Sequence, residues 1–157
     1  MSKTKGRLSL IVSTICAVLC LCGLVYVLFW VPDVVNSMID TVDHLGDRAN
    51  ITQTERTLII ADAYAMLAVA FLTVINILFL LRTVSKGLVF SKRAIMQLNS
   101  LMICCFIEGL LFASITFYFQ LALCVAIIAC LLGLLLRVVT HVIEEAIRLK
   151  QENDFTI

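Results

Sequence analysis

One acidic residue, Glu108, lies inside a long apolar stretch and is the first residue whose chemistry stands out. The stretch runs from Ala94 to Leu136, and Glu108 is its only charged side chain. A carboxyl group is costly to place in a lipid bilayer and usually has a function there. An apolar surrounding favours its neutral form, which can donate a hydrogen bond. We expect its partner to be Asn76 of the second helix, in an interhelical clamp, or Ser114 of the same helix, with a proton or cation relay as the alternative function.

The stretch around Glu108 must fold back on itself. A helix rises about 1.5 Å per residue, and about 20 residues cross the hydrocarbon core of a bilayer once. Residues 94–136 are too many for one crossing and suffice for two, with a turn near Phe117–Gln120. Their length therefore predicts two membrane-spanning helices joined by a tight turn.

The composition is typical of a membrane protein with a single domain. Of 157 residues, 62% are hydrophobic and 15% are charged, whereas soluble domains have about 25% charged residues. The net charge of +1 gives no reason to expect direct nucleic-acid binding. We predict an all-α, four-helix transmembrane bundle formed by residues 1–157. The expected spans are residues 8–31, 62–82, 95–117 and 121–140, followed by a cytoplasmic tail at 141–157.

The segment between the first two spans carries a helical pattern of its own. Val35, Ile39 and Val42 recur at helical spacing among acidic residues, which predicts a short amphipathic helix that Gly46 ends. Pro32 is expected to end the first span or to begin this helix. The short helix should lie outside the cytoplasm, either on the membrane surface or as a cap on the bundle.

Capping signals locate the other helices. Residues Thr52–Glu55 form a capping-box pattern, so the second helix should begin directly after Thr52. Gly87 offers a stop for this helix, and Ser91 is a suitable N-cap for the third. The fourth helix should begin near Leu121 and continue past the membrane, because apolar residues keep their helical period as far as Leu149.

Basic residues are distributed unevenly between the two sides of the predicted spans. Ten of the twelve Lys and Arg residues lie in the N-terminal flank, the connection Arg82–Arg93 and the tail, and only Arg48 and Arg56 lie in the loop after the first span. Basic residues in short flanks stay in the cytoplasm. Both termini are therefore expected there. A three-span alternative would leave the basic tail outside.

Small residues recur every three or four positions along the fourth span. Such residues let two membrane helices approach closely. Packing within the chain, against Gly23 or Gly109, is the expected use, and a homo-oligomer interface is the alternative. The stripe consists of Ala122, Ala126, Ala129 and Gly133.

The second connection and the tail together suggest a docking surface on the cytoplasmic side. The amphipathic tail needs a cover for its apolar stripe. Acidic residues near a helix C-terminus oppose the helix dipole, so they are better explained as contacts to basic groups of a partner or of the same chain. The candidates are Lys86, Phe90, Lys92, Arg93, Glu152, Asp154, Phe155 and Ile157.

No catalytic, cofactor or metal site is predicted. The sequence holds no phosphate-binding loop, no Ser/His/Asp arrangement and no metal-ligand spacing. All seven cysteines lie in apolar runs and are interpreted as packing residues. We therefore expect no enzyme activity and no cofactor.

Two short motifs resemble a bacterial four-pass family catalogued as domain of unknown function 2975. Residues 86–91, Lys-Gly-Leu-Val-Phe-Ser, followed by Leu98, resemble its G-x-x-F-S…L connection. Residues 145–157 resemble its lk-x-E-n-D-l-T-I terminus, with Phe155 in place of the usual leucine. The resemblance implies a bacterial inner-membrane protein without known enzyme activity. Members are often encoded beside a small Cro-type helix-turn-helix regulator, which implies that such a regulator is the cytosolic partner.

Three functions are compatible with these features. The leading hypothesis is a small regulatory or adaptor protein that acts through its cytoplasmic face. One alternative is a small transporter or channel component that uses Glu108 and Asn76. The other is an immunity-type protein that binds another membrane protein through its helices.

Overall fold

The computed structural model describes residues 2–44, 51–87 and 91–154, and these residues form four long helices. Each of the four is long and apolar enough to cross a membrane. The all-α fold with four candidate spans is therefore confirmed. The helices are α1 (Ser2–His44), α2 (Gln53–Ser85), α3 (Lys92–Ile115) and α4 (Leu121–Asp154).

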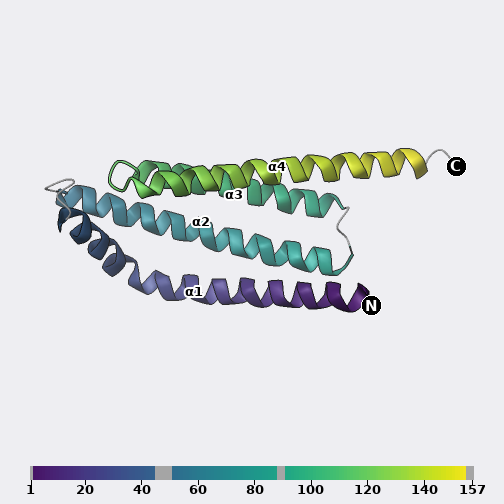
Figure 1. Ribbon diagram of the computed structural model, residues 1–157, viewed down its shortest axis with the longest axis horizontal. Helices are drawn as coiled ribbons and strands as arrows, with labels where there is room; N and C mark the ends of the chain where they lie inside the picture. Colours follow the sequence, from purple (N-terminus) through teal and green to yellow (C-terminus); the bar gives the residue numbers. More distant parts are fainter. Residues whose placement is uncertain (1, 45–50, 88–90, 155–157) are drawn as a thin grey trace.

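The helices pack in the order of the chain (Figure 1). α1 packs on α2, α2 on α3 and α3 on α4, and the described residues of α1 and α4 do not contact each other. The arrangement is therefore open. Both ends of the chain lie at the same end of the helices as the α2–α3 connection, which we call the terminal end. The α1–α2 and α3–α4 connections lie at the opposite, turn end.

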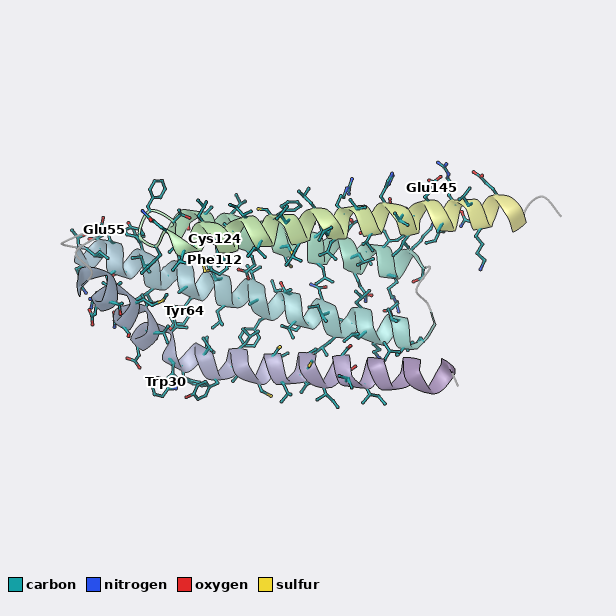
Figure 2. The ribbon with its side chains drawn as sticks, in the orientation of Figure 1. Trp30, Glu55, Tyr64, Phe112, Cys124 and Glu145 are labelled. Carbon is teal, nitrogen blue, oxygen red and sulfur yellow. The ribbon has the colours of Figure 1, made fainter. Side chains whose placement is uncertain are left out.

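The prediction that the first helix stops at Pro32 is wrong. α1 continues through Pro32 to His44, so the short amphipathic helix expected there is the last part of α1. A proline inside a helix removes one hydrogen bond, and this bends the helix if neighbouring packing holds the chain in place. α1 bends close to Trp30 and leans onto α2 (Figures 1 and 2).

A buried cluster at the turn end keeps the two parts of α1 in one helix. Ile39 is fully buried and Val35 is nearly so, which places the predicted apolar stripe against α2 as a cap. Arg56 and Asp40 form an ion pair at 3.4 Å beside the cluster. Because both side chains are partly exposed, this pair contributes at most about 1 kcal/mol. The cluster consists of Val31, Val35, Ile39, Ile59 and Leu67.

The predicted caps are present. The Glu55 backbone N–H donates to Thr52 Oγ1, and the Thr52 N–H donates to the Glu55 carboxylate at 2.8 Å, which completes the capping box. The Ala94 N–H donates to Ser91 Oγ at 3.2 Å at the start of α3. Gly87 follows α2 with a φ of +73°, a conformation that favours glycine.

α3 and α4 approach each other closely at Gly109. A Cβ atom placed on Gly109 would lie 2.7 Å from Cys130 Sγ and 3.3 Å from the Ala126 carbonyl oxygen. Farther along α4, a Cβ atom placed on Gly133 would lie 3.3 Å from the ring of Phe106. Ala122, Ala126 and Gly133 are buried and Ala129 is half-buried, so the small-residue stripe faces α3.

Substitution of Gly109 by Ala should weaken the α3–α4 pair. The added methyl group must displace Cys130 Sγ and press on the Ala126 carbonyl, and overpacking of this kind costs about 1–3 kcal/mol. Gly23 is a matched control, because a Cβ there meets nothing within 4 Å. We expect Gly109→Ala to lower the unfolding temperature in detergent and Gly23→Ala to leave it unchanged or raise it. Cys130→Ala in the Gly109→Ala background should restore part of the loss. Equal unfolding temperatures for the two single variants would contradict the close approach.

Candidate functional site

Glu108 is half-buried on α3 and stands without a polar partner. None of the described residues forms a hydrogen bond or an ion pair with its carboxyl group. The expected partner Asn76 donates its amide N–H to the Leu72 carbonyl of its own helix at 3.0 Å. The second expected partner, Ser114, contacts a different carboxylate. The interhelical clamp predicted at Glu108 is therefore not formed.

The register of α2 against α3 explains why Glu108 and Asn76 do not meet. Ser114 of α3 is paired with Asp62 of α2, which fixes which turns of the two antiparallel helices lie side by side. In this register Glu108 is level with residues near position 68. Asn76 lies about eight residues farther along α2, which corresponds to about 12 Å.

The polar link between α2 and α3 is the Asp62–Ser114 pair. Ser114 Oγ lies 2.5 Å from Asp62 Oδ2 and 2.6 Å from the Leu111 carbonyl oxygen. A serine hydroxyl carries one hydrogen, so both acceptors share it. The pair borders a hollow of about 450 Å³ at the turn end. The other lining residues are apolar apart from the Tyr118 hydroxyl, namely Leu58, Ile59, Ala65, Ile115 and Tyr118.

The Asp62–Ser114 pair is not among the predicted contacts, although the sequence carries a signal for it. Residue 62 is predicted only as the start of the second span. Counted from Leu88, in the connection of the hairpin, Asp62 and Ser114 are equally distant along the two helices. In an antiparallel hairpin, residues at equal distance from the turn lie opposite each other. One carboxylate and one hydroxyl form no catalytic set, so this pair is a structural link.

A second pocket lies between α2 and α3 at the terminal end. Its volume is about 310 Å³, and it brings together three cations. Lys86 and Arg93 are among the predicted docking residues. Arg82 of α2 and Gln97 of α3 also line the pocket but are not among them. Lys92 is exposed but does not line this pocket, and Phe90 lies outside the described residues. The lining residues are Phe79, Arg82, Thr83, Lys86, Arg93 and Gln97.

The acidic residues of the α4 tail are paired within their own helix. Arg148 contacts Glu145 at 2.7 Å and Glu152 at 3.7 Å. The predicted contact of the tail with the basic α2–α3 connection stays a prediction. The side chain of Asp154 and the residues Phe155 and Ile157 lie outside the described part of the chain.

Part of the apolar pattern on this stretch of α4 is uncovered. Val142 and Leu149 are 62% and 56% exposed, and Val139, at the end of the expected span, is 46% exposed. Ile143, Ala146 and Ile147 are half-buried. α4 is longer than the antiparallel α3 and extends beyond the residue at which α3 begins (Figure 1). Glu145 lies far from the turn that joins the two helices (Figure 2). The tail thus offers one apolar face and one charged face whose ion pairs are internal.

The described part of the chain contains no candidate metal-binding site. Within residues 2–44, 51–87 and 91–154, no group of three His, Cys, Asp or Glu residues could hold a metal ion. All seven cysteines are free thiols.

Comparison with known proteins gives a family and no activity. The model of the family described as "Protein of unknown function (DUF2975)" matches residues 41–157. No protein with a curated function and no solved structure matched the chain.

Because Glu108 lacks a polar partner among the described residues and Asp62 has one, substitution of the two residues should change stability in different directions. Removing an unpaired carboxyl group from apolar surroundings removes its desolvation cost, about 1–3 kcal/mol. Glu108→Leu should therefore leave the unfolding temperature in detergent unchanged or raise it. Asp62→Leu, the matched control, should lower it, because the link to Ser114 is lost. A Glu108→Leu variant that is less stable than the native chain would restore the clamp interpretation.

Proposed function

The chain belongs to the family described as "Protein of unknown function (DUF2975)", and from this premise we propose that it is a small regulatory or adaptor protein. In this proposal it resides in a bacterial inner membrane with both termini in the cytoplasm. It binds a cytosolic protein through the tail of α4. The exposed apolar side chains Val142 and Leu149 on this tail are the observation that carries the proposal.

The distribution of basic residues supports the proposed orientation. Figure 1 places both chain ends and the α2–α3 connection at the terminal end, and these are the segments that hold ten of the twelve Lys and Arg residues. Short basic flanks favour the cytoplasmic side. A stacked aromatic pair, Tyr26 and Trp30, lies in the half of α1 toward the turn end with ring centroids 6.0 Å apart. This position suits an aromatic belt at the opposite interface.

The α4 tail has the properties of a recognition helix. Val142 and Leu149 lie on one exposed apolar face, seven residues or two turns apart. Amphipathic helices with this spacing bind in apolar grooves of partner proteins. The internal ion pairs of Arg148 support the helix in water, each contributing a few tenths of a kcal/mol. The tail can therefore remain helical before the partner arrives.

A small helix-turn-helix regulator is the partner that we favour. The family resemblance implies such a protein, and a regulator bound to the membrane would be kept away from its DNA sites. Lys92, which is exposed at the start of α3, would extend the contact surface beyond α4. The partner would bind the nucleic acid, and this chain would not.

Transport is the second candidate function. The observation that favours it is Glu108, whose half-buried carboxyl group has no partner among the described residues. An intramembrane carboxylate is a common element of proton and ion pathways. In this case Glu108→Gln would abolish activity while the fold remained intact. The adaptor proposal expects Glu108→Gln to bind its partner as the native chain does.

Truncation and a pair of point substitutions test the docking surface. The probe is a small Cro-type helix-turn-helix protein from the same bacterium, fused to a fluorescent protein, and the measurement is its membrane-bound fraction. Val142→Ser/Leu149→Ser and deletion of residues 152–157 should each reduce this fraction at least about tenfold, since a few buried anchors dominate binding. The control Lys150→Ser should not change it. Unchanged membrane binding in the truncated and substituted chains would reject the adaptor proposal.

The orientation has a separate test. Single cysteines are introduced into a chain whose seven native cysteines are replaced by alanine. A membrane-impermeant maleimide added outside the cell should label positions 43 and 50 only, because the loop after α1 has few basic residues. Positions 88 and 153 should react only after the membrane is opened. Labelling of position 153 in intact cells would be incompatible with four spans and cytoplasmic termini.

A further inference from the structure

The pocket at the terminal end is lined, among the described residues, by three cationic side chains and by no acidic side chain. Arg82 and Lys86 come from the end of α2, and Arg93 comes from the first turn of α3. No carboxylate lines the pocket, and none in the described part of the chain pairs with these cations. Like charges held this close repel one another. An anion placed between them would remove that repulsion.

The donor groups fit a phosphate better than a simple monovalent anion. Two guanidinium groups can each offer a pair of parallel N–H donors, which match the spacing of phosphate oxygens. The Lys86 ammonium adds a point charge. α3 begins beside the pocket, and the N-terminal end of a helix attracts anions. The three cationic side chains, each exposed to the outside, line one small volume of about 310 Å³.

A neutral polar group in the pocket also lacks a partner. The Oε1 atom of Gln97 is buried and accepts no hydrogen bond. Such an orphaned acceptor carries a cost that a donor would remove. By contrast, the Thr83 hydroxyl already donates to the Phe79 carbonyl oxygen at 3.0 Å. After a rotation of the Gln97 amide toward the pocket, a ligand with a hydroxyl or amine hydrogen would supply the missing donor.

We propose that this pocket binds the phosphate of an anionic phospholipid headgroup. Phe79 lines the pocket one turn nearer the middle of α2, and its ring is 53% exposed. An apolar wall below a cationic rim suits a ligand with a charged head and a hydrocarbon chain. Arg82 marks the expected end of the second span, at the depth of headgroups, and basic pockets between spans recognise such lipids. The inference goes beyond the proposed adaptor function and does not depend on it.

The test measures lipid binding by the full chain in nanodiscs of phosphatidylcholine. Phosphatidylglycerol is added in steps, and the unfolding temperature is followed. We expect a saturating rise for the native chain. Arg82→Gln/Lys86→Gln/Arg93→Gln should weaken the apparent affinity on the order of 100-fold, because each cation near headgroups contributes roughly a fivefold factor. Sodium chloride should weaken the native binding.

A second triple variant with the same net charge is the matched control. Arg137, Arg148 and Lys150 are exposed cations outside the pocket, and their replacement by Gln should leave phosphatidylglycerol binding as in the native chain. Equal losses in the two triple variants would indicate general charge attraction and overturn the proposal. Inorganic phosphate and glycerol phosphate form a further arm. A pocket-dependent rise with either, in the absence of anionic lipid, would also overturn the lipid assignment.

Single variants keep the test decisive if the pocket triple variant folds poorly. Arg93→Gln alone should weaken phosphatidylglycerol binding about fivefold. Gln97→Leu should remove the unpaired acceptor, so it should raise the unfolding temperature without lipid and reduce the further rise with lipid. Native-like lipid binding in both single variants would count against the pocket.

Discussion

The close approach of α3 and α4 at Gly109 is the contact on which most of the molecule's outward features depend. α4 packs on α3 alone among the described helices, so α3 fixes the position and direction of everything that α4 carries. In a bilayer there is little hydrophobic gain from bringing two helices together, and close van der Waals packing between small residues takes its place. Gly109 allows the Ala126 and Cys130 turn of α4 to come near the α3 backbone. The projecting tail is therefore held by an interface inside the apolar region.

Much of the fold could be predicted because local rules decide it. Span lengths follow from bilayer thickness, and the starts of α2 and α3 follow from the capping groups of Thr52 and Ser91. The continuation of α1 past Pro32 could not be predicted in this way. A proline permits either an end or a bend, and the choice depends on whether later residues find a surface. Ile39 finds one on α2, which is a property of the assembled helices.

In the candidate sites, too, the residue type can be recognised in the sequence, whereas the contact partners depend on the register of the helices. Glu108 is conspicuous in the sequence because a carboxyl group is rare in an apolar run, yet its neighbours depend on how α2 lies along α3. Register places Ser114 beside Asp62 instead. It also places Arg93 beside Arg82 and Lys86, which no count of charges along the chain reveals. Hydroxyl groups such as Thr73 and Thr140 bond to carbonyl groups of their own helices, so they add no polar contact between helices.

The open packing order also bears on how the chain is made. Within the described residues each helix contacts only its neighbours in sequence, so each interface joins two segments that leave the ribosome one after the other. Such a topology has a low contact order, and low contact order favours rapid assembly. α2 can settle on α1 while α3 is still being synthesised, and α4 needs only α3. No stage of assembly requires the first helix to wait in the membrane for the last.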